Sequence, residues 1–530
     1  MRKGSLIVSA AVVAGLTVSV GPSARSQHPN HAGKFPKLCI QQAWVDPNQI
    51  CIVDIVSKFD LIQAGLSAEQ VQAVRAANPR AVIQPFWSTH FNMPDYRSTG
   101  STKMDVDEFV RDVSQLRSSG FDGVYIDLWN LLRESFADSL ADILRRTWPN
   151  GIHVVNAANS FEYSFALNGF LLEDYPVYSG DYGYYVEGPL ATWRQRGYKP
   201  TVIVLNVRSY GVDAQYFWEK ARFATTLGLL HDELYVMYNY GSGGSPHWAV
   251  PWWFDEWSAP IGTPVGPAQR LDSGVYFREF TNGVVLCNLS GETKRVSRSD
   301  LPTSGELYRI RGGQVPSWNN GALFDEVELK GWRLNNVDNK YAKRLGDGII
   351  LLRQPVTIVS DIIIDDEGTD DVDPNPTFMG RFQQSGMQFD PMGYRKWQNA
   401  WYVYGHSSCY YAPPSNGTSW ARWIPQINIS GSYEVFEWHP SSPELAKDAR
   451  YTIKWGKKET HLTVNQTTNG GKWNSLGVFW FQAGEENYVE VRSVPSGTVV
   501  ADAVKFVYRG TGDLRDSEPP SPPRGVRILP

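Results

Sequence analysis

The sequence has few cysteines for its length and no large excess of charge of either sign. Its 530 residues include 4 cysteines, 50 Lys and Arg against 55 Asp and Glu, and a formal net charge of −5. Without a basic excess the chain does not offer the phosphate contacts that nucleic acid requires, so we expect no nucleic-acid partner. None of the cysteines has the spacing of a zinc site. Cys39 and Cys51 are close enough in sequence for a disulfide, and both the bridged and the reduced form stay open.

Long apolar runs are also missing, except at the N-terminus. Residues 1–26 combine a positively charged start, an apolar run over residues 6–20, and the small residues Ala24 and Ser26 at a cleavage position. This pattern is typical of a signal peptide, and the run is shorter than the ~20 residues of a spanning helix. We therefore expect a secreted protein with no membrane association after signal removal. An uncleaved anchor is the alternative.

The length predicts several domains, because one domain usually takes about 100–200 residues. Strand-like and helix-like runs alternate eight times in the first half, which predicts a (β/α)8 TIM barrel. Short alternating strands follow, with a hairpin signal at Asn282 and Gly283. The expected order is a signal peptide (1–26), a barrel (35–265), a β-sandwich (266–364), an acidic linker (365–376), a second β-sandwich (377–509) and a Pro-rich tail (510–530).

Apolar periodicity places the barrel elements in the sequence. Ser67 and Gln70 form a capping-box pattern at the start of one helix. The predicted strands are 38–45, 59–64, 80–87, 121–127, 152–157, 169–173, 201–207 and 234–240, and the predicted helices are 67–77, 105–118, 135–148, 189–196 and 213–230.

Two of these strands end on carboxylates, Asp127 and the pair Glu173 and Asp174. Barrel enzymes gather their chemistry at the carboxyl ends of the strands. Hydrolysis of a glycosidic bond requires one carboxyl as acid and another as nucleophile or base. We predict Asp127 as nucleophile or base and Glu173 as acid. Successive strand residues face opposite sides, so Asp174 is the alternative to Glu173, and capping of the next helix is the structural alternative for Asp127.

Other polar and aromatic residues lie at or just beyond strand ends, where they are expected to hold sugar hydroxyls and ring faces. The predicted substrate-binding residues are Trp44, Gln84, Trp87, His90, Trp129, Asn156, Asn206, Arg208, Tyr238 and Asn239. The sequence contains no serine nucleophile elbow and no zinc box, and a pair of carboxylates needs no cofactor.

The last predicted sandwich resembles the golvesin C-terminal or xanthan-lyase carbohydrate-binding-like domain. The residues that carry the resemblance are 433–435, 464–466, 471–477 and 501–506, which read Tyr-Glu-Val, Val-Asn-Gln, Gly-Lys-Trp-Asn-Ser-Leu-Gly and Ala-Asp-Ala-Val-Lys-Phe. Such modules occur on secreted proteins that act on polysaccharides.

The strand over residues 121–127 is similar to the Gly-Val-Phe-(Leu/Ile)-Asp strands of polygalactosaminidase-like barrels. This resemblance implies a secreted glycoside hydrolase with a polysaccharide or oligosaccharide substrate and carries over Asp127, but not the second carboxylate. The alternative is a non-catalytic extracellular protein with a barrel scaffold that binds glycan or another partner. The sequence leaves open the sugar, its linkage, retention or inversion, endo or exo action, and the oligomeric state.

Overall fold

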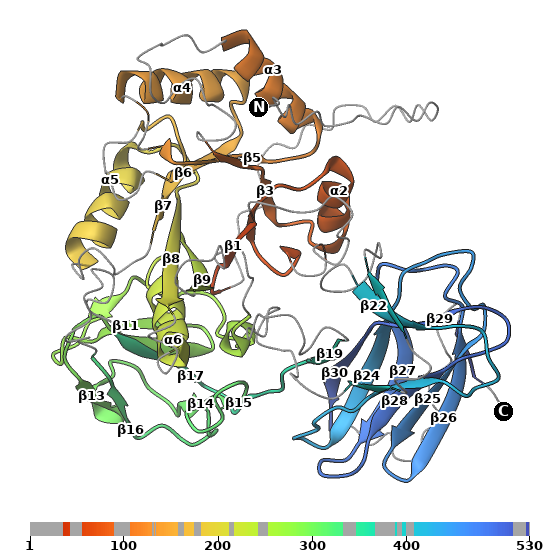
Figure 1. Ribbon diagram of the computed structural model, residues 1–530. Helices are drawn as coiled ribbons and strands as arrows, with labels where there is room; N and C mark the ends of the chain where they lie inside the picture. The colour runs from red at the N-terminus through yellow and green to blue at the C-terminus, as the bar shows by residue number, and fades with distance from the viewer. Residues whose placement is uncertain are drawn as a thin grey trace.

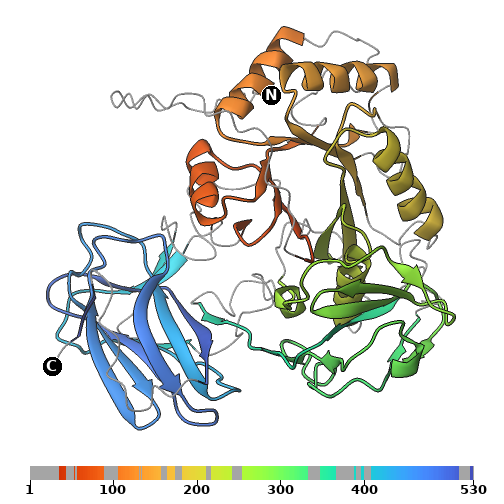
Figure 2. The ribbon, with the colours of Figure 1, turned by 180° about the vertical axis from the view of Figure 1, so that it is seen from behind.

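The computed structural model describes most of the chain in several ranges (Figures 1 and 2). The described residues are 35–42, 53, 56–88, 106–129, 132, 134–156, 164–173, 182–210, 217–241, 253–331, 346–365, 387–389, 395–398, 408–511 and 526–528. They form a multidomain chain that is richer in β-strands than in helices. The expected signal peptide and most of the expected linker lie outside these ranges. No helix within the described ranges is long and apolar enough to span a bilayer.

The first unit contains a strand at each of the eight positions that the sequence predicted. One of them is interrupted at Pro85, which has no N–H to donate to a ladder. The strands are β1 (Cys39–Gln42), β2 (Leu61–Ala64), β3 (Val82–Gln84), β4 (Phe86–Ser88), β5 (Gly123–Asp127), β6 (Ile152–Asn156), β7 (Gly169–Leu172), β8 (Val202–Tyr210) and β9 (Leu234–Gly241).

All these strands pair in parallel, in the orders β1-β2-β3 and β4-β5-β6-β7-β8-β9. The two sheets are linked where β3 continues through Pro85, whose carbonyl accepts a bond of 3.3 Å from the Tyr125 N–H. At the other end a parallel bridge joins Leu38 to Val236, and the Val236 N–H donates to the Lys37 carbonyl at 2.8 Å. The carboxyl ends of the strands therefore point the same way.

Helices follow most of these strands and lie on the outer side of the parallel sheets (Figure 1). They are α2 (Ala68–Ala77), α3 (Val106–Ser118), α4 (Glu134–Thr147), α5 (Gly188–Arg196), which continues the π-helix η3 (Gly183–Glu187), and α6 (Phe217–Gly228). The capping box is confirmed, since the Ser67 hydroxyl accepts from the Gln70 N–H at 3.2 Å and the Gln70 side chain accepts from the Ser67 N–H at 2.9 Å. Each of the five predicted helices is present with small shifts at its ends.

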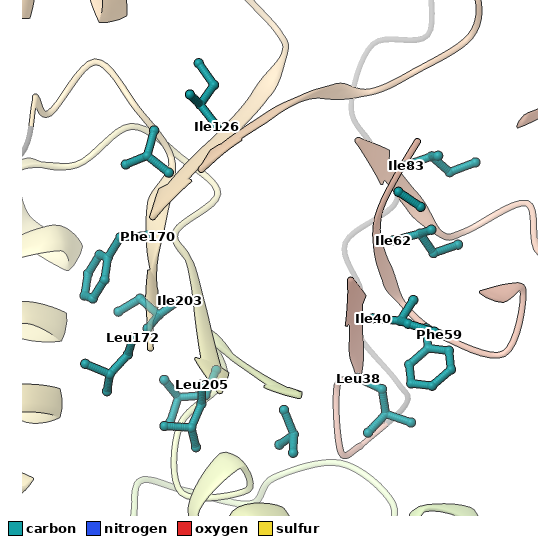
Figure 3. Close-up of a cluster of buried hydrophobic side chains, with 14 of the residues drawn as sticks. Leu38, Ile40, Phe59, Ile62, Ile83, Ile126, Phe170, Leu172, Ile203 and Leu205 are labelled. Atoms are coloured by element: carbon teal, nitrogen blue, oxygen red, sulfur yellow. The ribbon is translucent and has the colours of Figure 1, made fainter. Parts of the chain in front are cut away.

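Side chains on the parallel strands alternate between two apolar clusters, because successive residues of a strand point to opposite faces of the sheet. In Figure 3, Ile62 and Ile83 point to one side while Phe170 and Leu172 point to the other, away from the space between the strands. These residues belong to the cluster that the helices cover. The second cluster occupies the opposite face of the same strands, the face away from the helices. We call it the enclosed cluster, and this face the enclosed face. It contains Cys39, Leu61, Val82, Tyr125, Ile152, Val154, Leu171, Val202, Val204, Tyr235 and Met237.

Cys39 lies in this enclosed cluster as a free, buried thiol. A Cys39–Cys51 disulfide, one of the two open alternatives, is therefore not formed. Cys51 itself is outside the described residues. Burial raises the pKa of the Cys39 thiol, which keeps it protonated and unreactive.

The second unit is mainly antiparallel and confirms the predicted hairpin. Strands β11 (Tyr276–Phe280) and β12 (Gly283–Asn288) pair across the turn. The main sheet has the order β10-β11-β12-β17-β14, with β10 (Gln269–Arg270), β14 (Tyr308–Arg309) and β17 (Asp347–Leu352). The small pairs are β13 (Lys294–Ser297) with β16 (Glu326–Leu329), and β15 (Arg311–Gly312) with β18 (Thr357–Ile358).

The third unit packs two antiparallel sheets around an apolar core. One sheet has the order β19-β30-β24-β27, with β19 (Ile362–Ile364), β24 (Gly431–Trp438), β27 (Asn474–Phe481) and β30 (Ala503–Gly510). The other has the order β20-β23-β28-β25-β26-β31, with β20 (Met387–Phe389), β23 (Trp420–Trp423), β25 (Ala449–Trp455), β26 (Lys458–Val464), β28 (Tyr488–Arg492) and β31 (Val526–Ile528). A small sheet joins β21 (Arg395–Gln398), β22 (Ser408–Ala412) and β29 (Val499–Ala501).

Two segments differ from the expected domain limits. Strand β19 falls in the range expected for the second unit, but it pairs with β30 of the third. Its three isoleucines suit a sheet with a buried face. The expected Pro-rich tail ends in β31, which pairs with β26. The third unit thus includes one strand before and one strand after the range predicted for it.

Charged side chains are buried where the first and second units meet. Arg222 of α6 pairs with Asp347 of β17, with 3.2 Å between Nε and Oδ1. Glu256, which is 3% exposed, accepts from the Asn319 side chain at 2.8 Å. Burial raises the pKa of Glu256 to about 7, although Arg222 opposes this shift.

The raised pKa of Glu256 predicts a stability change with pH. From its ordinary value of 4.5 to about 7, the folded chain holds a proton that the unfolded chain releases, so stability falls as pH rises through this window. The loss is up to about 3 kcal/mol. Glu256→Gln keeps the oxygen that accepts from Asn319 but cannot ionise. The Tm of this variant should therefore exceed that of the wild type at about pH 8 and approach it at about pH 5. A Tm difference that is the same at both pH values contradicts this assignment.

Candidate functional site

Three of the predicted residues meet at the carboxyl ends of adjacent strands. Asp127 ends β5, Asn156 ends β6, and Glu173 directly follows β7. The Asn156 side-chain nitrogen donates to Asp127 Oδ1 at 2.9 Å and to Glu173 Oε2 at 3.1 Å. One amide group therefore holds both carboxylates.

The shared nitrogen limits the distance between the two carboxylates. Their nearest oxygens are no more than about 6 Å apart, because each lies within a hydrogen bond of the same nitrogen. Asn156 is 4% exposed, whereas Asp127 and Glu173 are both partly exposed. The amide thus lies beneath two acidic groups that solvent, or a substrate, can reach.

Strand alternation explains why these three side chains converge. Each of them follows by two residues a member of the enclosed apolar cluster, namely Tyr125, Val154 and Leu171. Residues two apart on a strand share a face. The same rule, applied to the alternative between Glu173 and Asp174, favours Glu173, whose contact with Asn156 is described. Asp174 lies outside the described residues.

The backbone turns sharply after Asp127. Leu128 has a φ of 57°, a left-handed conformation that costs a bulky residue of order 1–3 kcal/mol. The turn leads to Trp129, which is 3% exposed and packs in the core under the helices. A short 3-10 turn includes Trp129, whose carbonyl accepts from the Leu132 N–H at 3.0 Å, and helix α4 begins at Glu134.

A row of glutamines lies on the enclosed face of β1, β2 and β3. The Gln41 side chain donates to Gln63 at 2.6 Å, Gln63 donates to Gln84 at 2.8 Å, and Gln84 donates to the Ile152 carbonyl at 2.7 Å. Burial, followed by the nearby charges of Asp127 and Glu173, raises the pKa of Tyr125, which also bonds to Gln41. A network of three amides and one hydroxyl therefore connects the strands next to the carboxylates.

Gln41 and Gln63 were not among the predicted site residues. Gln41 and Gln63 follow Cys39 and Leu61 by two residues. Because residues two apart on a strand share a face, this spacing alone places both glutamines on the enclosed face. Gln84 was predicted to contact substrate, but it is fully buried and both ends of its amide bond to protein groups. We therefore assign it to the internal network.

Three predicted aromatic residues face the helices instead of the enclosed side. Trp129 and Tyr238 are both 3% exposed and belong to the core beneath the helices. Trp87 packs on Phe109 of α3 with 5.7 Å between ring centroids. Trp87 and Tyr238 lie one position out of phase with Phe86 and Met237, whereas Trp129 follows the left-handed turn at Leu128. Their role is packing, which corrects the expectation that they hold sugar rings.

The remaining predicted residues are only partly described. Asn206 is fully buried, two residues after Val204 and therefore on the enclosed face. Arg208 and Asn239 are register partners on β8 and β9, but their side chains lie outside the description. Trp44 and His90 lie outside the described residues altogether.

A third acidic residue near this strand is structural. Asp122 precedes β5 and pairs with Arg75 of α2 at 2.5 Å. It also accepts from the Ile83 N–H at 2.9 Å. Asp122 therefore fastens a helix and two strands at the end opposite to Asp127.

Comparison with known proteins identifies the third unit. Residues 393–508 match the golvesin C-terminal domain family, which confirms the resemblance found in the sequence. The chain is 36% identical over 98 residues to a xanthan lyase of Bacillus sp. (strain GL1), covering 18% of this chain and 10% of that protein. It is 33% identical over 108 residues to golvesin of Dictyostelium discoideum, covering 20% of this chain and 18% of golvesin. The chain thus spans less than a fifth of either relative.

Two solved structures illustrate how far the likeness extends. A Paenibacillus xanthan lyase aligns with 47% of this chain and 25% of its own, at 20% identity and a TM-score of 0.26. An α-amylase from Geobacillus thermoleovorans in complex with acarbose aligns with 59% of this chain and 96% of its own, at 10% identity and a TM-score of 0.34. Scores this low support no conclusion about the first unit.

The shared amide predicts how a substitution of Asn156 acts. Asn156→Leu removes a donor to two charged acceptors and should cost about 1.5–3 kcal/mol in the free energy of unfolding near pH 7. Urea unfolding of the wild type and the variant near pH 7 measures this difference.

The variant Asp127→Asn supplies the control for this experiment. If the amide acts through the carboxylate, the effects of Asn156→Leu and Asp127→Asn should not add in a double-mutant cycle. Additive effects of the two substitutions would show that Asn156 contributes packing alone.

Proposed function

We propose that this chain is a secreted glycoside hydrolase that cleaves O-glycosidic bonds of a polysaccharide, with Asp127 as nucleophile and Glu173 as acid and base. The observation that carries the proposal is the Asn156 amide, which donates to both carboxylates at 2.9 and 3.1 Å. Two partly exposed carboxyl groups on adjacent strand ends are what glycoside cleavage requires. In a protein without this chemistry, two like charges held this close would only destabilise the fold.

The spacing of the carboxylates favours retention of the anomeric configuration. Retaining glycosidases place the two carboxyl groups about 5–5.5 Å apart, whereas inverting enzymes need about 6.5–9.5 Å to admit a water molecule. The limit of about 6 Å between the nearest oxygens falls below the inverting range.

The reaction then proceeds in two balanced steps. Asp127 attacks the anomeric carbon and forms an ester bond, while the glycosidic bond breaks and its oxygen takes the proton from Glu173. In the second step Glu173 removes a proton from water, whose oxygen replaces Asp127 at the same carbon. Asn156 keeps both groups in place, and its donors stabilise the negative charge that alternates between them.

The surrounding architecture supports this assignment. We propose that the parallel strands form a (β/α)8 barrel, since all of them pair in parallel and Leu38 is bridged to Val236. In such a barrel the carboxyl ends of the strands carry the active site. We further propose that residues 35–265 form this catalytic unit and that residues 1–26 direct its export.

The third unit supports a polysaccharide as substrate. It belongs to the golvesin C-terminal domain family, and one of its relatives is a xanthan lyase, by its name an enzyme that acts on a polysaccharide. We therefore infer a polysaccharide substrate from the family of the third unit, which is attached to the proposed catalytic unit. Arg208 of β8 and its register partner Asn239 of β9 are the proposed contacts to the sugar.

The proposal predicts the effect of removing either carboxylate. Asp127→Asn and Glu173→Gln keep the shape of each side chain, so both variants should fold, but each should release reducing ends at least about 10²-fold more slowly than the wild type. The measurement is reducing-end release from a panel of neutral and acidic polysaccharides.

The matched control is Asp142→Asn, which changes the same chemical group on the exposed face of α4 and should leave the rate unaltered. Binding of glycan without release by the wild type would favour the alternative of a non-catalytic extracellular protein. An unsaturated product would indicate a lyase.

A further inference from the structure

The six-stranded sheet of the third unit presents one face to solvent. Strands β28, β25 and β26 of this sheet are labelled in Figure 1, and β23 pairs with β28. Alternate residues of these strands, such as Val489, Val491 and Ile453, are buried in the core of the unit. The residues between them therefore share the outer face. In register, the outer rows are Trp420, Arg492, Arg450 and Thr463, then Arg422, Glu490, Thr452 and His461, and then Tyr488, Lys454 and Glu459.

One buried carboxylate on this face orients two guanidinium groups. Glu490 is 4% exposed at its side chain, and its Oε2 accepts from Arg422 Nη2 at 2.6 Å and Nε at 3.1 Å. Its Oε1 accepts from Arg492 Nε at 2.7 Å. The side chains of Arg422 and Arg492 remain 24% and 45% exposed. Both guanidiniums thus keep N–H groups that a ligand can reach.

A third arginine adds positive charge that the sheet does not neutralise. Arg450 lies directly opposite Arg492 in the strand register and is exposed. Among the described residues no acidic side chain pairs with Arg450. Like charges that face each other across strands destabilise a sheet. An anion above the two arginines would remove this repulsion.

Aromatic rings lie beside these arginines. Arg422 stacks over the Tyr488 ring at 3.9 Å and lies 5.3 Å from the centroid of the partly exposed Trp420. Stacking on a ring keeps a guanidinium flat and in place. The face thus combines a guanidinium held in position by stacking with the partly exposed indole of Trp420, a surface suited to a chain of rings that carries carboxylates.

We propose that this face, defined by Trp420, Arg422, Arg450 and Arg492, binds an acidic polysaccharide whose carboxylates pair with the arginines. The positive charge identifies the occupant as anionic, and the planar guanidinium groups match carboxylates in pairs of hydrogen bonds. The site lies on the third unit, away from Asp127 and Glu173, and does not depend on catalysis. It would hold the chain on its polymer while the first unit acts.

Affinity electrophoresis of the full chain in gels that contain polygalacturonate tests this proposal. The same polymer in its methyl-esterified form is the matched probe, because esterification removes the charge and keeps the sugar. We expect retardation by polygalacturonate and little by the ester. Arg450→Gln and Arg492→Gln should each raise the dissociation constant about tenfold, as loss of a charge-assisted bond predicts.

Arg509→Gln is the control variant, since Arg509 is an exposed arginine of the same unit that pairs with Glu434 on the other sheet. It changes the net charge equally and should leave binding within about twofold. The proposal is overturned if all three variants weaken polygalacturonate binding equally, or if the methyl ester retards the protein as much as polygalacturonate does. Equally tight binding of heparin and DNA would likewise show general charge attraction and overturn it. So would an absence of binding to polygalacturonate, alginate and hyaluronan alike.

Discussion

One side-chain amide organises the candidate site. Asn156 is buried, and each hydrogen of its NH2 group is directed to a different carboxylate, on Asp127 and on Glu173. Because an amide nitrogen offers two donors at a fixed angle, it sets the separation of the two acids as well as their orientation. The adjacent parallel strands supply the remaining constraint, since they bring three strand ends to one edge. The chemistry proposed for this chain depends on that separation.

The surrounding structure keeps this arrangement rigid. Below the carboxylates, Tyr125 and the row of buried glutamines connect the strands through side-chain hydrogen bonds. Beside them, the left-handed Leu128 ends the strand abruptly, so that Asp127 stays at its tip. Strain and buried polar groups both cost stability, and their presence around two acidic residues is typical of a functional site.

Sequence periodicity predicted the positions of the strands and helices well, because each apolar stripe is covered by a neighbour in the structure. It also predicted that Asp127, Asn156 and Glu173 lie at strand ends. It failed for Tyr238, which lies one position out of phase with the enclosed residues of its strand, and for Trp129, which follows the left-handed turn at Leu128; both face the helices. Composition could not reveal that Ile362–Ile364 pairs with the third unit, because a short apolar strand suits either of two neighbouring sheets. The hydrogen bonds from Gln41 to Gln84 and the arginine face of the third unit depend on which residues lie opposite each other on neighbouring strands. A single sequence does not provide this register.

The most direct test of the central claim is the anomeric configuration of the first product, measured by proton NMR immediately after cleavage of a polysaccharide that the wild-type protein degrades. Two carboxylates held by one amide, within about 6 Å of each other, predict a product with the configuration of the substrate. A product of inverted configuration would contradict the account, as would cleavage that persists unchanged in the Asp127→Asn variant.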